Sequence, residues 1–272
     1  MKKQNKIALF LLVAGLAAGC ATSDFMGDFN LISPERETAL GRELSQGIAK
    51  EETLVTDPEI AGYVSQIGRR LVAVSQTANQ PRHFHVIDKD QVNAFAIPGG
   101  HMYVMTGLIE AAKTEAELAA VMAHELAHDE ERHPTERLSR QMGMQMLMNV
   151  LLGKNPGQTQ QVVSSLLANS GISAYSRSAE FQADRIGTYL LNRAGYDPHA
   201  MVNFFQTLVA LEQQQGGGGA TRSLFATHPP TPDRIQAVKE LVASFGNQRS
   251  RQKAIVGNFS TIQKKVKARR KK

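Results

Sequence analysis

The stretch VMAHELAHDEERHP, residues 121–134, contains two histidines four positions apart, with a glutamate directly after the first. An α-helix returns to the same face about every four residues, so His124 and His128 would project together and could share one metal ion. Glu125 would lie beside that ion without being its best-placed ligand, as a water-activating general base must. A helix that merely carries polar residues on one side is the alternative. The small and apolar residues around the histidines favour a packed helix with a zinc site.

A catalytic zinc site needs a third protein ligand and keeps its fourth position open. One class of zinc peptidases places a third histidine six residues after the second, but that position holds Pro134 here. A carboxylate from a later helix is the other source, and residues 178–195 read as such a helix. In it Glu180 and Asp184 lie four apart, so Glu180 could bind the metal while Asp184 accepts the free N–H of a ligand histidine. Taken alone, this pair is better explained as an exposed acidic face.

The remaining patterns predict several helices and a small sheet. Residues 82–88 alternate between apolar and polar side chains, and residues 92–107 contain two short extended runs about a Pro-Gly-Gly turn. Together these segments predict about three strands. His83 and His85 would share one face of the first strand, where a second metal site is conceivable. Exposed strand histidines are the stronger interpretation of that pair.

Four motifs in this order carry a resemblance to a known family: NAFAIPGG at 93–100, ELAAVMAHELAH…RH at 117–133, SAEFQADRIG at 178–187 and HPPTPDRI at 228–235. Together they resemble the HtpX-like zinc metallopeptidases, which are related to the CAAX prenyl proteases. The resemblance is to their periplasmic lipoprotein branch, of the LoiP and BepA type, and spans about residues 33–243. It does not extend to a C-terminal helical repeat domain, so partners recruited through such repeats are not expected.

The resemblance implies an α+β, mostly helical zincin-like fold of the gluzincin kind with a small sheet. It also implies one Zn²⁺ per chain with three protein ligands, which are His124, His128 and Glu180. Glu125 would be the catalytic base, and Asp184 would act catalytically by supporting a ligand histidine.

Two residues of the last motif have open roles. In the related peptidases a histidine at the position of His228 can reach the zinc and block its open position, whereas an ordinary loop histidine is an equally good interpretation. The glycine-rich residues 216–219 precede it and would give such a gate freedom to move. Arg234 could stabilise the transition-state oxyanion, or it could only fix the last helix in place.

The N-terminus, MKKQNKIALFLLVAGLAAGC, has three lysines before an apolar run that is too short to span a bilayer comfortably. This is the pattern of a secretory signal, and the single cysteine of the chain, Cys20, stands where cleavage is expected. That position resembles a bacterial lipobox, which implies lipidation of Cys20 and sorting to the periplasmic face of the outer membrane. An ordinary signal peptide is the alternative. The predicted organisation is a signal peptide (1–19), a tether (20–32), a zinc metallopeptidase domain (33–246) and a basic C-terminal tail (247–272).

The formal net charge of +6 is misleading, because the basic residues are concentrated at the two ends. Residues 249–272 contain ten Lys or Arg and no Asp or Glu, whereas residues 20–248 carry 18 basic and 25 acidic side chains. A charge run of this kind predicts a solvated, disordered tail that could bind anionic lipid or polymer. Nucleic acid is not an expected partner of an exported chain.

These observations predict a zinc endopeptidase in which a zinc-activated water hydrolyses peptide bonds of unfolded or misassembled envelope proteins. The strand at residues 102–105 would pair with an extended substrate backbone. The alternative is a chaperone-like envelope assembly factor whose zinc site is silenced by His228. A purely structural zinc site is disfavoured, because such sites are closed and mostly use cysteine.

Overall fold

The computed structural model describes residues 30, 32–168, 174–214, 222–246 and 256–270. The predicted signal peptide, Cys20 and most of the predicted tether lie outside these residues. In chain order the described elements are α1 (Pro34–Glu51), α2 (Pro58–Val72), β1 (His83–Ile87), β2 (Ala94–Ile97), β3 (His101–Met105), α3 (Thr106–Ala111), α4 (Glu115–Glu130), α5 (His133–Leu151), α6 (Pro156–Ala168), α7 (Arg177–Arg193), α8 (His199–Gln214), α9 (Arg222–Thr227), α10 (Pro232–Ser244) and α11 (Phe259–Arg269). The predicted mostly helical α+β fold with a three-stranded sheet is confirmed.

The sheet has the order β1-β3-β2, with β1 parallel and β2 antiparallel to β3. The turn between β2 and β3 contains Gly99 and Gly100, whose φ values of 82° and 79° favour glycine. The prediction that residues 102–105 form a substrate-binding edge is wrong, because β3 is hydrogen-bonded to a strand on each side. The edge strands of the described sheet are β1 and β2 instead.

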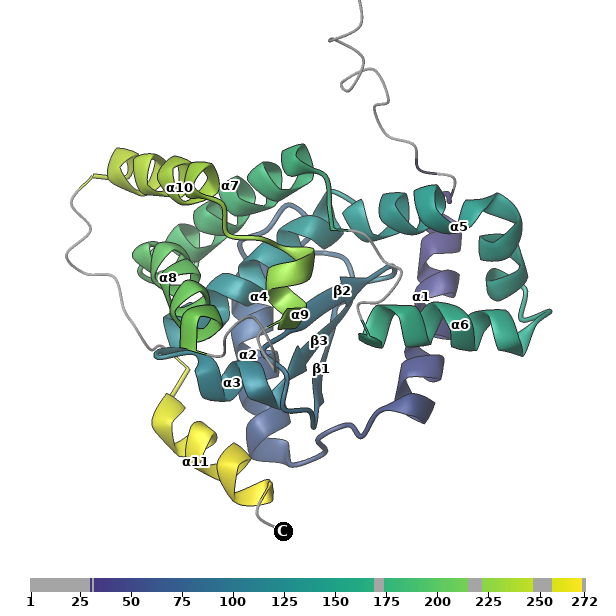
Figure 1. Cartoon of the computed structure of the whole chain (residues 1–272), viewed down its shortest axis with the longest axis horizontal. Coiled ribbons are helices and arrows are strands. Elements are labelled where there is room, and N and C mark those ends of the chain that lie inside the picture. Colours follow the sequence, from purple (N-terminus) through teal and green to yellow (C-terminus); the bar gives the residue numbers. More distant parts are fainter. Residues whose placement is uncertain (1–29, 31, 169–173, 215–221, 247–255, 271–272) are drawn as a thin grey trace, which may run out of the picture.

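Each face of the sheet packs against its own set of helices (Figure 1). Val86, Ala94 and Val104 point into a core shared with α2, α4, α7 and α8. On the other face Ile87, Ile97, Tyr103 and Met105 pack with α1, α5 and α6. Because side chains alternate between faces along a strand, this division follows directly from the strand register. Helix α4 therefore lies at the centre of the domain.

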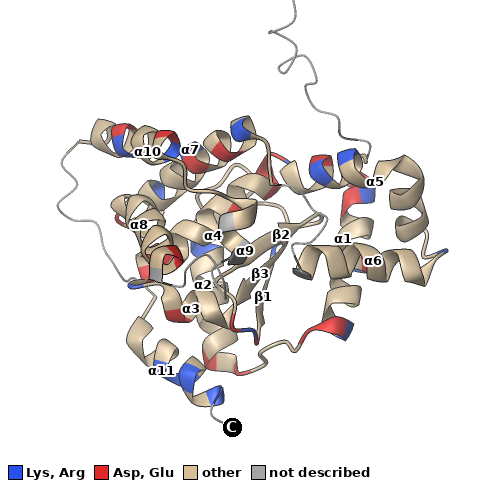
Figure 2. Cartoon of the chain, viewed as in Figure 1, with Lys and Arg blue, Asp and Glu red and all other residues tan. Residues whose placement is uncertain are grey.

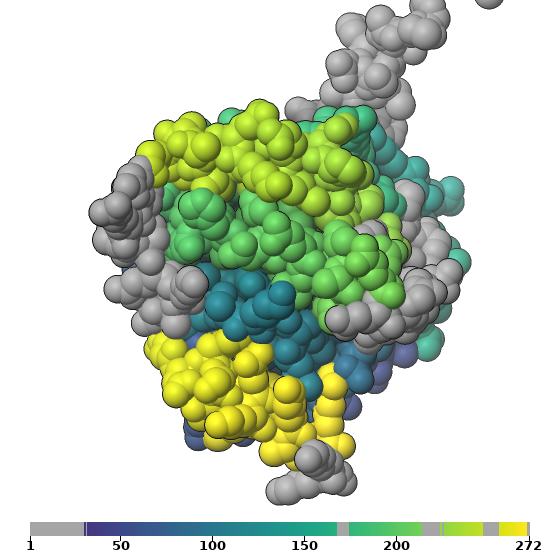
Figure 3. All heavy atoms as spheres, turned by 60° about the vertical axis from the view of Figure 1, so that its left-hand side comes forward, coloured from purple at the N-terminus to yellow at the C-terminus, as the bar shows by residue number. Residues whose placement is uncertain are grey.

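The C-terminal helix α11 corrects the predicted solvated tail. Phe259, Ile262 and Val266 are buried against α2 and α3, and the Phe259 ring stacks on Tyr63 at 6.2 Å between ring centroids. Figure 3 shows the yellow atoms of this helix lying directly on the surface of the domain. The spacing of 259, 262 and 266 is that of one helical face. Charge alone gave no indication of this apolar stripe, so residues 256–270 were wrongly assigned to a disordered segment.

Several Lys and Arg residues of α11, coloured blue in Figure 2, form ion pairs with acidic residues of the domain. These ion pairs are Lys265–Glu59 at 2.5 Å, Arg269–Asp88 at 3.4 Å, Arg270–Asp90 at 2.7 Å and Arg270–Glu110 at 3.1 Å. Part of the positive charge is thus balanced by the acidic domain. No helix among the described residues is long and apolar enough to cross a bilayer.

Candidate metal centre

Helix α4 carries both histidines of the first motif and is positioned by its own cap. The Thr114 side chain accepts a hydrogen bond from the backbone N–H of Glu117, and the Glu117 carboxylate accepts one from the backbone N–H of Lys113. The sequence TEAE, residues 114–117, has the pattern of a capping box, although the Glu117 carboxylate here binds the N–H of the residue before the cap. His124 and His128 are buried, with 5% and 0% of their surface exposed. Buried imidazoles must find polar partners, so their surroundings define the site.

Helix α7 brings its carboxylates to the same place. Ser176 caps the helix by accepting a hydrogen bond from Ala179 N–H. A Cβ on Gly187 would lie 3.0 Å from the backbone nitrogen of His124, so the missing side chain allows α7 to pack closely against α4. Glu180 and Asp184 each have 2% of their surface exposed. The pair is therefore not an exposed acidic face, which was the stronger interpretation of these two residues alone.

Four side chains converge in a group that could hold a metal ion: His124, His128, Glu180 and His228. His124 Nε2 lies 3.0 Å from His128 Nε2 and 3.6 Å from Glu180 Oε2, and His128 Nε2 lies 3.5 Å from Glu180 Oε1. Ligands of a tetrahedral zinc ion with bonds of 2.0–2.1 Å would be about 3.3 Å apart. The donor set and its spacing therefore fit Zn²⁺.

His228 is part of this group and not an unrelated loop histidine. It follows α9 directly, and its backbone N–H donates to Leu224 C=O at 2.8 Å. Its Nδ1 lies 2.8 Å from Glu180 Oε1 and 3.2 Å from His124 Nε2. Those separations also match a shared tetrahedral ion. The glycine-rich residues 216–219 lie outside the described residues.

Glu125 faces the same centre from α4 without joining the four-residue group. Its Oε1 lies 3.5 Å from His228 Nε2, and its Oε2 accepts a hydrogen bond of 3.3 Å from the backbone N–H of Ala96 on β2. Burial raises the pKa of Glu125 to about 7. A carboxylate with a pKa near neutrality is suited to accepting and returning a proton.

Asp184 and Arg234 contact His124 and Glu180 on the side away from the metal group. Asp184 Oδ1 is 3.0 Å from His124 Nδ1, the ring nitrogen that faces away from the metal group. Arg234 contacts both carboxylates, with Nε 2.6 Å from Asp184 Oδ2, Nη2 2.7 Å from Asp184 Oδ1 and Nη1 2.6 Å from Glu180 Oε2. Every guanidinium nitrogen thus contacts an acceptor, and of the two roles left open by the sequence this geometry favours the anchoring one over the oxyanion contact.

Neighbouring cations and hydrogen-bond donors keep the two carboxylates ionised. Burial alone would raise the pKa of Glu180, but His228, His128 and His124 outweigh it and lower the pKa. Burial acts in the same direction on Asp184, and hydrogen bonds from Arg234 and His124 again lower the pKa overall. Burial also holds the pKa of His128 well below its ordinary value, so this imidazole is neutral. Neutral imidazoles and ionised carboxylates are the forms that bind zinc.

Two residues of the site were not identified from the sequence. The Tyr175 ring stacks on the His128 ring, with centroids 4.1 Å apart, and the Arg137 guanidinium carbon lies 4.4 Å above the centre of Tyr175. His133, one residue before the position that Pro134 occupies, places its Nδ1 2.8 Å from His128 Nδ1. No sequence motif links Tyr175 or Arg137 to His128, because their segments are separate in the chain and meet at His128 only in the folded structure.

A cleft opens beside the metal centre. It is lined by Glu125, His228, Tyr175 and Thr227, by residues 93–96 and Pro98 of and around β2, and by Pro134, Arg137, Leu138 and Leu166 from α5 and α6. The free edge of β2 thus forms one wall, and a mostly apolar helical pair forms the other.

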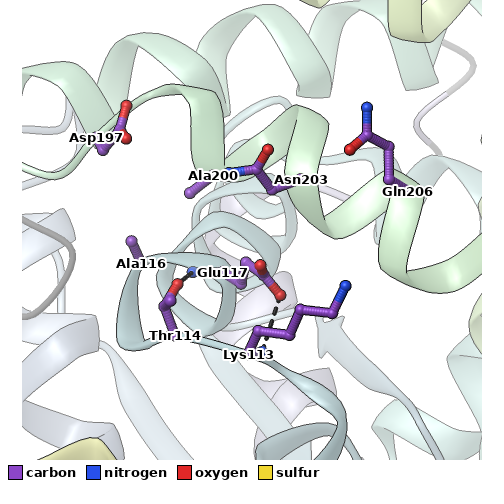
Figure 4. A pocket seen from close by; sticks show the side chains of 8 residues that line it. All are labelled: Lys113, Thr114, Ala116, Glu117, Asp197, Ala200, Asn203 and Gln206. Carbon is purple, nitrogen blue, oxygen red and sulfur yellow. Dashed lines mark hydrogen bonds between the residues drawn. The ribbon is translucent and has the colours of Figure 1, made fainter.

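A separate hollow at the opposite end of α4 contains no residue of this centre. Figure 4 shows Asn203 and Gln206 of α8 facing Lys113 and Glu117. The Glu117 carboxylate already accepts one hydrogen bond from the backbone N–H of Lys113 and one of 3.4 Å from Thr207 Oγ1. The hollow brings together no set of catalytic or metal-binding groups.

Comparisons with known proteins agree with this geometry. The model of peptidase family M48 matches residues 58–242. The beta-barrel assembly-enhancing protease of Yersinia pestis is 30% identical over 249 residues, which cover 84% of this chain and 51% of that protein. The mitochondrial metalloendopeptidase OMA1 of Schizosaccharomyces pombe is 35% identical over 179 residues, covering 65% of this chain and 52% of that protein. The metalloprotease YcaL of Escherichia coli is 26% identical over 258 residues, covering 90% of this chain and 99% of that protein. The chain thus spans about half the length of the first two relatives.

Proposed function

The chain belongs to peptidase family M48, and on this premise we propose that it is a zinc-dependent endopeptidase of the bacterial cell envelope. The observation that carries the proposal is the convergence of two buried histidine nitrogens and a buried carboxylate at the spacing of zinc ligands. Structural zinc sites are mostly built from cysteine, and the single cysteine of the chain is Cys20, far from the site in sequence.

The division of roles follows from the contacts. His124, His128 and Glu180 would hold the zinc, which supplies Lewis acidity to a bound water and to the substrate carbonyl. Glu125 would take a proton from the attacking water and return it to the leaving amine. Asp184 would accept the Nδ1–H of His124, which leaves Nε2 free to bind the metal, and Arg234 would hold Asp184 and Glu180 in place.

Substrate would bind as an extended strand along β2. The edge of β2 lies beside the base, since Ala96 N–H is hydrogen-bonded to Glu125. An unpaired edge binds polypeptide by backbone hydrogen bonds, which favours unfolded or locally extended segments. The apolar residues on the opposite wall, such as Leu138 and Leu166, would contact substrate side chains.

The alternative function is a chaperone-like assembly factor whose zinc site is closed. The position of His228 Nδ1 among the metal-binding atoms favours this alternative, because a fourth protein ligand would leave no place for water. We regard the described arrangement as the resting form of a peptidase that opens when His228 moves away.

We infer the class of substrate and the location from the relatives and from the N-terminus. The relatives named as beta-barrel assembly-enhancing proteases suggest outer-membrane or periplasmic proteins as substrates. Signal-peptide cleavage and lipidation at Cys20 would place the domain on the periplasmic face of the outer membrane. Anionic lipid or polymer could still contact the exposed Lys264 and Lys267 of α11.

The test is substrate trapping in cells with Glu125→Gln, which keeps the shape of the side chain and removes the base. Bound envelope proteins should accumulate on this variant and be cleaved by the wild type. Glu131→Gln, at the exposed end of the same helix, is the matched control and should retain turnover. If Glu125→Gln supports envelope integrity as well as the wild type does, the chaperone-like alternative replaces the peptidase.

A further inference from the structure

The cleft beside the metal centre contains a guanidinium that no carboxylate among the described residues neutralises. Arg137 of α5 lines this cleft together with Glu125 and His228. Its buried Nε has no hydrogen-bond partner, and no ion pair joins it to a carboxylate within the described part of the chain. Arg234, by contrast, contacts two carboxylates. A buried cationic donor without an anion is costly, and at a binding site the missing acceptor is a ligand.

The surroundings of Arg137 hold it toward the centre. Its guanidinium lies on the Tyr175 ring, and that ring stacks on His128, so the three groups form a continuous stack from the cleft to a metal ligand. A cation over the face of an aromatic ring is attracted to that ring, which holds the Arg137 guanidinium against Tyr175. The positive charge also acts on the catalytic base, since it lowers the pKa of Glu125 against the larger effect of burial.

Peptide hydrolysis requires a donor at this location. When a water oxygen bonds to the carbonyl carbon, the π electrons of the C=O bond move to the carbonyl oxygen, and the water's proton goes to Glu125. The oxygen then carries a negative charge, which preorganised donors would stabilise in addition to the Lewis acidity that a zinc ion would supply. Arg234 is held away from this role, because each of its three nitrogens already contacts Asp184 or Glu180 behind the ligands.

We propose that Arg137 binds the carbonyl oxygen of the scissile peptide and stabilises the oxyanion formed there. This inference rests on the proposed peptidase function and adds a catalytic residue to it. Arg137 keeps its protons throughout, and the negative charge returns to the C=O bond when the C–N bond breaks and Glu125 protonates the amine. The competing explanation is that Arg137 only props Tyr175 against His128.

The test compares Arg137→Gln and Arg137→Lys with Arg140→Gln, a change on the exposed side of the same helix, where Arg140 pairs with Glu136. Kinetics are measured in wild type and in His228→Ala. We expect Arg137→Gln to lower kcat about 10²–10³-fold with KM little changed, and Arg137→Lys to recover part of the loss. Arg140→Gln should match its parent, and zinc content should be unchanged in all three.

A second measurement does not depend on turnover. Calorimetry should show that Arg137→Gln weakens a phosphinic peptide, whose anionic oxygens imitate the tetrahedral intermediate, by a similar factor. Binding of the matching amide peptide, measured in the Glu125→Gln background, should change little. Unchanged kcat, or equal weakening of both peptides, would overturn the inference. Loss of zinc together with activity would show instead that Arg137 only holds Tyr175 in place against His128. If both the wild type and His228→Ala are inactive, the proposed peptidase function is rejected, and this outcome is distinct from a failure of the role proposed for Arg137.

Discussion

His228 Nδ1 lies 2.8 Å from Glu180 Oε1, so this histidine of the last motif is a fourth possible metal ligand beside the predicted third ligand, Glu180. If it fills the fourth position at rest, no water can be activated there. His228→Ala should then raise peptidase activity on an unfolded substrate, measured as the rate of peptide release. Adding Glu125→Gln should abolish the gain, because the base is still required. A clear fall in turnover with zinc retained would instead assign His228 to transition-state binding.

The purified domain should hold one zinc ion per chain, measured by atomic absorption. His124→Ala, His128→Ala and Glu180→Ala should each remove most of it, since each deletes one ligand. Asp184→Ala should weaken zinc binding about 10–100-fold, because it only orients His124. His199→Ala, an exposed histidine at the start of α8, is the control and should keep full occupancy. Full zinc content in Glu180→Ala would place the third ligand elsewhere.

Cys20→Ser should move the protein from the membrane fraction to the soluble periplasmic fraction, because stable attachment needs acyl chains at that residue. Removing the C-terminal segment would be a poor control for charge, because it would also remove the packed helix α11. Lys264→Glu with Lys267→Glu in the Cys20→Ser background changes only exposed charges. If Cys20→Ser remains membrane-bound and the added charge reversal releases it, electrostatic attachment is sufficient.

Ile262→Ala should lower the free energy of unfolding by about 2–5 kcal/mol, the range for large-to-small changes in a packed core. Ile262 is buried in α11 with 6% of its surface exposed, so the cost arises from lost contacts with the domain. Lys264→Ala, on the exposed side of the same helix, should stay within about 0.5 kcal/mol. Urea unfolding measures both. Equal stability of Ile262→Ala and wild type would support the original prediction that this segment is a solvated tail.

Stability should fall in mild acid through the histidines of the sheet. Burial lowers the pKa of His101 to about 4, with His83 and His85 adding to the shift, from an ordinary value of 6.5. The unfolded chain therefore binds a proton at His101 more readily than the folded chain does. The folded state is not penalised above about pH 6.5, and its free energy of unfolding decreases as the pH falls toward 4. His101→Gln should flatten the dependence of unfolding free energy on pH between 4 and 7, measured by urea unfolding at each pH, and an unchanged slope would contradict this assignment.

The sequence by itself determined the local chemistry of the site. The spacing of His124 and His128, the TEAE cap before them and the pairing of Glu180 with Asp184 depend on helical periodicity, which is a property of neighbouring residues. The small sheet followed in the same way from alternation and a glycine turn. These signals are read from short stretches, and the structure contains the elements that they predict.

Only the tertiary structure decided which segments meet. The strand order put β3 in the middle and left β2 as the edge beside Glu125, because pairing between strands is a long-range choice that alternation does not encode. The apolar stripe of α11 became a packed face only against α2 and α3. His228, Arg137 and Tyr175 come from separate parts of the chain, and their roles depend on distances across the fold. Spacing along a sequence specifies one face of a helix, whereas a site assembled from several elements requires their packing.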